Sequence, residues 1–284
     1  MTIHAPMPSI VSVANGSAEL RQRVARREIT ERRRITQKLR HALATGGFIL
    51  CYQPIVSFKT GLACGAETLI RLRHSRRGLI PAQHFMPIAE RSDVIIDVTG
   101  WMLQTACAEA ATWPAGFTVA VALSLRHLQS GRIVRQLLEA LNRSDLTPEQ
   151  LELEITEAML IDGNAETVFS LKALQGIGVR LALNNFGTGY ASLSALKSLP
   201  FSTLRLDRSL THNLSEGEAG AAIVHAAIKA GHALGCSVLA DGVETEAQFR
   251  KLSDIGADEG QGLYFSPAVN AEEMAAMFAP SLHV

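Results

Sequence analysis

The sequence predicts an α/β protein built as a closed (β/α)8 barrel, and three observations indicate this fold class. Short β-rich runs alternate with longer amphipathic stretches, which is typical of a parallel sheet covered by helices. Eight such runs fall within about 235 residues, a number and length that suit a closed barrel. No GxGxxG segment follows a strand and there is no P-loop, so the alternative, an open doubly wound sheet, lacks its usual phosphate-binding motifs.

The expected strands are short and rich in apolar and β-branched residues. In chain order they cover residues 48–56, 64–72, 118–125, 151–155, 179–184, 203–207 and 237–241, with a weaker candidate at 260–264. Helical stretches lie between them, for example over residues 82–113 and 218–235. Hydrophobic residues make up 47% of the 284 residues, which is enough for the large core that such a barrel requires.

The first 46 residues are strongly basic and precede the first expected strand. They contain nine Lys or Arg against three Asp or Glu, although the whole chain is neutral. We interpret this segment either as a solvated helix or as a contact surface for an acidic partner, an anionic membrane or nucleic acid. Its heptad pattern is too poor to indicate a coiled coil.

Helical spacing marks the place where this segment joins the domain. Ile35, Leu39 and Leu43 form one apolar stripe, and a pair of glycines ends it. We therefore expect two parts. Residues 1–34 are an N-terminal extension, disordered at first and then a basic helix, and residues 35–284 are the barrel domain.

Cysteine usage and hydropathy favour a cytoplasmic location. The four cysteines are scattered and form no CxxC pair, which suits reduced thiols better than disulfides or a zinc site. No apolar run reaches the roughly 18 residues that span a bilayer. The N-terminus lacks the basic-then-apolar plan of a secretory signal, and the histidines show no HExxH spacing.

Polar side chains stand near the carboxyl ends of the expected strands, where a (β/α)8 barrel carries its chemistry. They are Glu67, Glu154, Asn184, Asn185, Arg205, Asp207, Asp241 and Gln261. A polar residue near the end of a buried strand costs free energy unless it is paired or functional. Any one of them could be a satisfied core group, but six strands that converge on one mouth indicate a site. The third strand is the exception and carries Ala122.

Eight motifs follow one another between about Ile35 and Phe278. They are YQPIV (52–56), ETLIRL (67–72), AQHFMPIAE (82–90), LELEITE (151–157), NNFGTGYASLSALKSLP (184–200), LRLDRS (204–209), ADGVETEAQF (240–249) and GADEGQG (256–262). In this order they resemble the EAL family, the barrel domains that hydrolyse the bacterial second messenger cyclic di-GMP. The resemblance implies a TIM-like barrel of the EAL type and a part in bacterial signal transduction.

The same resemblance implies an altered metal site. The family hydrolyses its phosphodiester with two divalent cations, magnesium or manganese, which prefer carboxylate oxygens. Glu67 and Glu154 match two of the ligand positions and are the residual metal candidates. The altered positions are Ala122 for an asparagine, Asn184 and Asn185 for an aspartate pair, Arg205 for a lysine and Asp241 for a glutamate. Because two anionic ligands are lost, we expect a degenerate member with no competent catalytic residues.

The positions that hold the ligand are better preserved. Arg71 corresponds to the arginine that contacts the cyclic dinucleotide, and a guanidinium suits a phosphate bidentately. Glu90 matches a residue beside the same cleft, and Arg205 could direct a second guanidinium toward a phosphate. Asp207 either pairs with Arg205 or contacts the ligand. The ligand-binding residues that the resemblance implies are Gln53, Glu67, Leu69, Arg71, Pro87, Arg205, Asp207, Glu244 and Gln261.

These observations favour a receptor that binds cyclic di-GMP without hydrolysing it and requires no metal cofactor for binding. Two alternatives stay open. One is a protein-interaction module that controls a transcription or motility regulator, with the basic N-terminal helix as a possible surface. The other is a weak phosphodiesterase that depends on magnesium or manganese. The GTG turn (187–189) belongs to a loop that reaches the dimer interface in enzymatic relatives, so a homodimer is a further expectation.

Overall fold

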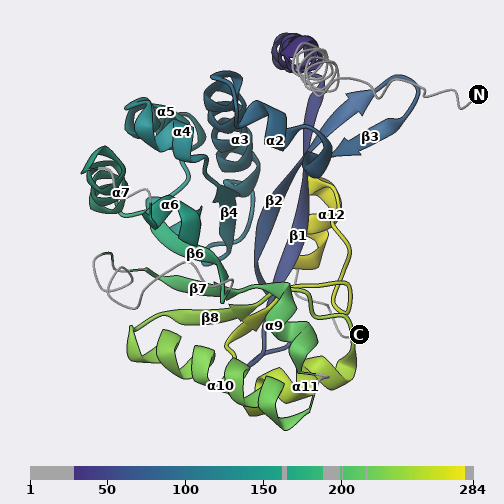
Figure 1. Cartoon of the computed structure of the whole chain (residues 1–284), viewed down its shortest axis with the longest axis vertical. Coiled ribbons are helices and arrows are strands. Elements are labelled where there is room, and N and C mark those ends of the chain that lie inside the picture. Colours follow the sequence, from purple (N-terminus) through teal and green to yellow (C-terminus); the bar gives the residue numbers. More distant parts are fainter. Residues whose placement is uncertain (1–28, 162–164, 188–198, 200, 215–216, 279–284) are drawn as a thin grey trace, which may run out of the picture.

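The chain folds around a closed ring of eight strands (Figure 1), as the sequence predicts. The computed structural model describes residues 29–161, 165–187, 199, 201–214 and 217–278, so the disorder expected for residues 1–18 lies outside the described part. The strands of the ring are β1 (Phe48–Ser57), β2 (Ala63–His74), β4 (Thr118–Ala122), β5 (Leu151–Thr156), β6 (Arg180–Phe186), β7 (Thr203–Leu206), β8 (Ser237–Ala240) and β9 (Glu259–Gly260). A ninth strand, β3 (Gly78–Pro81), pairs with the outer end of β2 and was not expected.

The direction of β1 differs from the all-parallel sheet that the alternation of elements predicts. β1 runs antiparallel to both of its neighbours, β2 and β9, whereas the other pairs in the ring are parallel. Only residues 58–62 connect β1 to β2. A parallel connection needs a crossover of about a dozen residues or more, so a link of this length permits only a hairpin.

Helices cover the outside of the ring (Figure 1). The predicted helical stretch 82–113 divides into η1 (Ala82–His84), α2 (Met86–Ala89) and α3 (Val94–Ala110), while 218–235 becomes α10 (Glu218–Ala233). The remaining helices are α4 (Leu125–Gln129), α5 (Ile133–Ser144), η2 (Pro148–Gln150), α6 (Glu157–Ile161), α7 (Ala165–Ile177), α9 (Arg208–Asn213), α11 (Glu246–Asp254) and α12 (Ala271–Phe278). No helix in the described residues is long and apolar enough to cross a membrane.

The alternation of side chains along each strand separates an apolar layer from a polar interior. In β5, Leu153 and Ile155 are fully buried and belong to the apolar core, while Glu152 and Glu154 face the opposite way. In β7, Leu204 belongs to the same core, and Thr203 Oγ1 donates to Glu152 Oε2 at 2.6 Å. The interior of the ring is therefore lined by paired polar groups.

The basic segment ahead of β1 is a helix over residues 29–45 in the described part of the chain. Its apolar stripe packs on the domain as expected, with Leu39 fully buried and Ile35 and Leu43 against the core. The helix is continuous through residue 34, so the predicted division between residues 34 and 35 falls within one element.

Buried His127 makes the stability of the fold sensitive to acid. It lies on α4, its Nε2 is 2.5 Å from Gln136 Oε1, and burial lowers its pKa to about 4. The unfolded chain binds this proton near pH 6.5 and the folded chain only near pH 4, so stability falls as the pH falls through that window.

We expect the His127→Gln variant to lack this loss. Between pH 6.5 and pH 4, wild type should lose about 3 kcal/mol of unfolding free energy relative to the variant. Urea unfolding at several pH values measures this difference, which also cancels the contributions of carboxyl groups common to both proteins. Parallel pH profiles for the two proteins would contradict the prediction.

Candidate functional site

A single guanidinium lies at the centre of the polar interior. Arg205, on β7, has a side chain that is only 1% exposed. Its Nη1 donates to Glu154 Oε1 on β5, and its Nη2 donates to Glu67 Oε2 on β2 at 2.6 Å. The same Nη2 donates to the Oε1 atom of Gln261, directly after β9, at 2.8 Å. One side chain thus connects four sides of the barrel.

The surrounding carboxylates explain why a cation is stable at this depth. Burial alone would lower the pKa of Arg205, but the charges of Glu67 and Asp241 outweigh burial and raise it. Asp241 is half-buried after β8 and accepts a hydrogen bond from Gly242 N at 2.7 Å. Burial, followed by the repulsion of Glu67, raises the pKa of Asp241. There are thus more carboxylates than guanidinium groups here, and Asp241 accepts a proton more readily than an exposed aspartate does.

A bulge in β6 places both asparagines opposite Arg205. Asn184 and Asn185 lie between consecutive ladder pairs, where β7 has only Arg205. Asn185 has a φ of 60°, in the left-handed region that asparagine tolerates. Asn184 Nδ2 donates to Glu154 Oε2 at 2.9 Å, and Asn184 Oδ1 accepts from Asn185 N at 2.8 Å. An ionised aspartate at position 184 could not donate and would oppose Glu154 with a like charge.

Two glutamines complete the network beside β1. Gln261 Nε2 donates to Glu67 Oε2 at 2.6 Å and to Gln53 Oε1 at 3.1 Å. Gln53 also lies directly opposite Glu67 in the β1–β2 ladder. Gly262 allows the chain to turn here, because its φ is 154° and a Cβ would lie 2.1 Å from the carbonyl oxygen of Val243.

The donor set does not fit a pair of divalent cations. Both carboxylate oxygens of Glu154 accept hydrogen bonds, one from Arg205 and one from Asn184. Magnesium needs hard oxygen ligands, and Ala122, at the end of β4, offers none from its side chain. No group of three His, Cys, Asp or Glu side chains that could hold a metal ion occurs among the described residues. A cation between Glu67 and Glu154 would have to displace the guanidinium.

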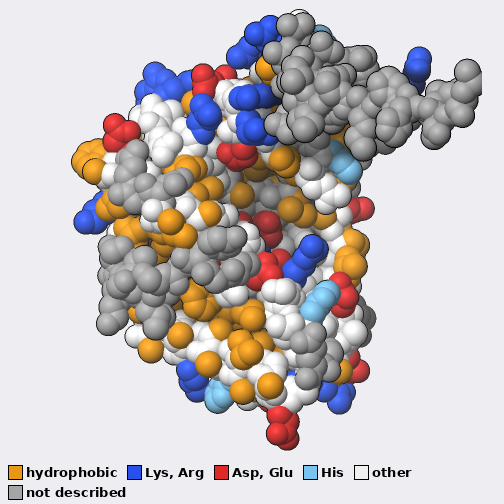
Figure 2. All heavy atoms as spheres, viewed as in Figure 1, with side chains coloured by type: hydrophobic (Ala, Val, Ile, Leu, Met, Phe, Trp, Pro, Cys, Tyr) orange, Lys and Arg blue, Asp and Glu red, His pale blue; other side chains and the backbone are white. Residues whose placement is uncertain are grey.

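Arg71 stands above this network on the same face of β2. Glu67, Leu69 and Arg71 alternate along the strand and therefore share a face. Arg71 lies in the part of β2 that extends beyond the ring and pairs with β3. Its Nη1 donates to the carbonyl of Ile70 at 3.1 Å, and it has no ion pair within the described ranges. Figure 2 shows a hollow over this end of the barrel in which acidic and basic side chains gather.

Helix α2 borders the same end of the barrel. Pro87, in its first turn, is exposed, and Glu90 follows its last residue. Glu90 Oε2 accepts from the hydroxyl of Ser124, just after β4, at 2.9 Å, and burial raises the pKa of Glu90. Nothing in the sequence alone indicated that Ser124 holds this carboxyl group in place.

The structure joins six of the residues that the sequence singles out by side-chain hydrogen bonds and leaves others apart. One hydrogen-bonded network contains Gln53, Glu67, Glu154, Asn184, Arg205 and Gln261. Glu244 is apart from it, exposed on the loop after β8, with His212 Nε2 at 3.7 Å.

Two expectations for the β7 end require correction. Asp207 does not pair with Arg205, because it begins α9 and accepts from Ser209 N at 2.9 Å. Arg205 does not direct its guanidinium toward the open groove, because Glu67 and Glu154 hold it inside the barrel. Sequence position could not reveal this, since all three partners of Arg205 are distant in the chain.

Sequence reasoning also missed a contribution from Glu157. This residue follows β5, is 2% exposed, and accepts from Gly187 N at 3.2 Å through Oε1. It therefore anchors the start of the glycine turn, whose residues 188 and 189 lie outside the described part. An acidic residue at the end of the LELEITE motif was the available signal.

Comparison with known proteins shows the family to which the chain belongs. The model of the EAL domain matches residues 36–268, and the chain belongs to that family. It is 38% identical over 88% of its length to the uncharacterized protein sll1895 of Synechocystis, of which it covers 36%. It is 35% identical, over 88% of its length, to the bifunctional diguanylate cyclase/cyclic di-GMP phosphodiesterase MucR of Pseudomonas aeruginosa, of which it covers 37%.

Solved structures show the same fold. The PaMucR phosphodiesterase in complex with c-di-GMP superposes with a TM-score of 0.80 at 35% identity, over 85% of this chain and 99% of that one. The family and its relatives place the chain among domains of cyclic di-GMP signalling. The chain spans about a third of the length of the first curated relatives that it matches.

We expect the Arg205→Ala variant to lose about 3–5 kcal/mol of unfolding free energy, because Glu154 and Glu67 would keep their charges in the interior without a partner. Urea unfolding measures the loss. The control is Arg250→Ala, which removes an exposed pair with Glu246 and should cost under about 1 kcal/mol. Equal, small losses for both variants would show that the buried pairs contribute little.

Proposed function

We propose that the chain is a degenerate EAL-domain receptor that binds cyclic di-GMP without hydrolysing it and without a metal ion. The observation that carries the proposal is the position of Arg205, whose guanidinium pairs both Glu67 and Glu154 inside the barrel. In the family, these two carboxylates are metal ligands and the residue at position 205 is a lysine. Here the guanidinium of Arg205 neutralises the two carboxylates in place of metal ions.

The loss of hydrolysis follows from what a guanidinium cannot do. Two-metal hydrolysis lowers the pKa of a bound water and stabilises the leaving oxygen with a cation that accepts lone pairs. Arg205 stays protonated, has no vacant coordination position, and cannot act as a base. Asn184 adds a neutral donor to Glu154 where an anionic ligand would be required.

Retention of the nucleotide is supported by the groove above the network. Arg71 has no ion pair within the described residues, so its guanidinium is available for a phosphate. Gln53, Leu69 and Pro87, which match the family's ligand positions, lie on β1, β2 and α2. The PaMucR relative, at 35% identity, binds c-di-GMP on the same fold. We therefore assign the ligand contacts to these positions, together with Glu244 after β8 and Asp207 at the start of α9.

Two other functions define the outcomes of the test. A protein-interaction module would bind a regulator and ignore the nucleotide. A weak phosphodiesterase would displace Arg205 and use Glu67, Glu154 and Asp241 for magnesium or manganese. A homodimer, as expected from the family, is compatible with each of the three.

We expect calorimetric titration of the chain with cyclic di-GMP to give micromolar or tighter binding in excess EDTA. Arg71→Ala should weaken binding at least tenfold because it removes a charge-assisted contact to phosphate. Arg143→Ala, on the exposed side of α5, removes the same charge elsewhere and should bind as wild type does.

The same titration separates the alternatives. Binding that appears only with manganese, together with a linear product, would establish the phosphodiesterase. If the titration gives no binding heat and no product forms under any condition, the receptor assignment is wrong and the interaction module is the remaining function.

We expect restoration of the family's residues to restore metal-dependent turnover. The quadruple variant Ala122→Asn/Asn184→Asp/Asn185→Asp/Arg205→Lys replaces the internal cation with anionic ligands and a lysine. In manganese, chromatography should detect linear dinucleotide from this variant at a rate at least tenfold above wild type. A variant that folds and binds manganese, yet forms no product, would show that the altered positions are not what prevents hydrolysis.

A further inference from the structure

The helix over residues 29–45 and the β2 end over residues 71–77 form one basic lobe. These two segments hold nine Lys or Arg and one Asp or Glu. The remainder of the chain, which is neutral as a whole, holds 18 Lys or Arg and 26 Asp or Glu. The segments are neighbours in space, because Arg34, Lys38 and His41 line the same groove as Arg73 and His74. The chain is therefore strongly polarised, with its positive charge gathered at one end.

Most cations of the basic lobe form no ion pair with the rest of the described chain. Arg34 pairs with Glu31, but no other Lys or Arg of the helix forms an ion pair within the part of the chain that the structure describes. The exposed cations are Arg32, Arg33, Lys38, Arg40, Arg73, Arg76 and Arg77. Seven exposed charges of one sign on a small surface repel one another, which costs stability in the free protein.

The helix presents these cations on two flanks. Successive residues of the helix are rotated by about 100°. One side of the helix packs on the core through Ile35 and Leu39, so two flanks and an outward ridge remain exposed. One flank carries Arg32, Thr36 and Arg40, and the other carries Arg34, Lys38 and His41. Gln37 lines both grooves and therefore lies between the two rows, while Arg33 lines only the first groove.

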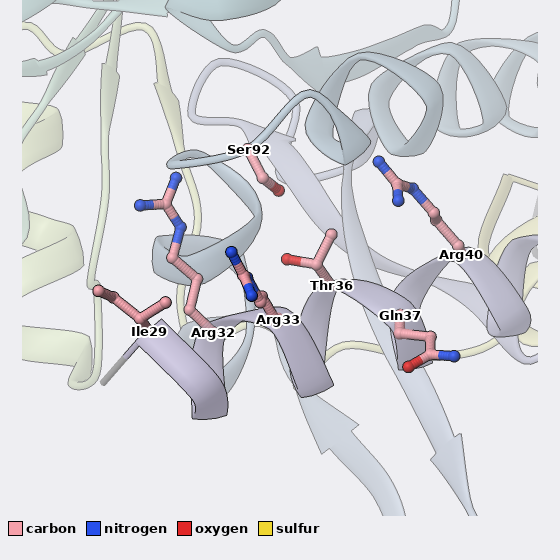
Figure 3. A pocket seen from close by; sticks show the side chains of 7 residues that line it. All are labelled: Ile29, Arg32, Arg33, Thr36, Gln37, Arg40 and Ser92. Carbon is pink, nitrogen blue, oxygen red and sulfur yellow. The ribbon is translucent and has the colours of Figure 1, made fainter. Parts of the chain in front are cut away.

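A groove runs along each flank. The first, of about 560 Å³, separates the helix from the α2–α3 connection at Ser92. Figure 3 shows Arg32, Arg33 and Arg40 extending into this groove from the helix, with Ser92 opposite. The second, of about 630 Å³, lies between the helix and the β2 end. Because the grooves are similar in size, the helix is a ridge with a cationic channel on each side.

We propose that this basic lobe binds double-stranded DNA, with the helix over residues 29–45 in the major groove and one phosphate backbone along each flank. An α-helix with its side chains is about 10–12 Å wide, which matches a B-form major groove of about 12 Å. The flanks supply guanidinium, ammonium, hydroxyl and amide donors, which are the groups that contact phosphates. In A-form RNA the major groove is too narrow and deep to admit the helix.

The same observations disfavour a membrane. A helix that lies on a bilayer inserts an apolar face, but the apolar face of this helix is buried against the barrel. They also favour DNA over an acidic peptide, because the cations form two parallel rows instead of one cleft. The proposal does not rest on cyclic di-GMP binding, because its contacts are assigned to the helix and to Arg73, Arg76 and Arg77, and not to Arg71.

The test is fluorescence anisotropy of the full chain with a labelled DNA duplex of about 20 base pairs and mixed sequence, over a range of salt concentrations. We expect micromolar binding at low salt that weakens steeply as salt rises. Arg32→Gln/Arg40→Gln on one flank and Arg73→Gln/Arg77→Gln beside the other should each weaken binding at least tenfold. Each pair should also reduce the slope of log K against log salt by about 2.

The matched control is Arg143→Gln/Lys172→Gln, which removes two exposed charges from α5 and α7. It should bind DNA within about twofold of wild type if binding is local to the lobe. Thermal unfolding of every variant verifies that the fold is intact. An equal loss in the control and in the lobe variants would overturn the assignment.

Three further ligands test the choice of DNA. They are duplex RNA of the same sequence, vesicles with about 30% phosphatidylserine, and polyglutamate. Weaker binding of all three than of DNA supports the proposal. Absence of DNA binding at low salt, or tighter binding of any of the three, overturns it.

Discussion

The guanidinium of Arg205, held between Glu67 and Glu154, is the interaction on which the rest of this barrel depends. Removing three charges from water costs several kcal/mol for each, and only mutual pairing with further hydrogen bonds offsets that cost. The network supplies these bonds: Asn184 donates to Glu154, and Gln261 donates to Glu67. Loss of Arg205 would leave the charges of Glu67 and Glu154 without their cation. The altered residues are therefore best understood as one coupled set, in which the amide at position 184 is the partner that the pairing of Arg205 with Glu154 requires.

In the proposed receptor, the guanidinium of Arg205 is a permanent internal cation between two carboxylates that hold metal ions in the family. A bound metal can leave, exchange or be chelated, whereas the side chain of Arg205 is covalently part of β7 and cannot. The interior thereby keeps its shape, including the bulge at Asn184 and Asn185, while the groove around Arg71 remains above it. In the proposed receptor, binding and hydrolysis are separable for a physical reason. Arg71, the residue assigned to a phosphate, lies on the part of β2 that extends beyond the ring, and the groups that would activate water lie within the ring.

Charge is distributed on two scales in this molecule. In the interior, opposite charges are paired at hydrogen-bond distance and hold the strands together. On the surface, the cations of the basic lobe other than Arg34 form no ion pair within the described residues, so their field extends into solvent and weakens with salt over about 10 Å. The first arrangement stabilises the domain. The second opposes stability slightly, and such a cost is typical of a surface that meets an oppositely charged partner.

Sequence by itself determined the strands, the apolar stripe of the first helix, the family and the identity of the polar residues at the barrel mouth, because alternation and spacing are local properties of the chain. The weak candidate at 260–264 was misplaced, because β9 spans Glu259–Gly260 and shares only residue 260 with it. Only the tertiary structure decided the direction of Arg205, the bulge that sets both asparagines opposite it, and the capping role of Asp207. Glu67 and Arg205 are 138 positions apart. Whether a buried arginine points outward to a ligand or inward to two carboxylates depends on which strands the closed ring brings side by side, and no local pattern carries that information.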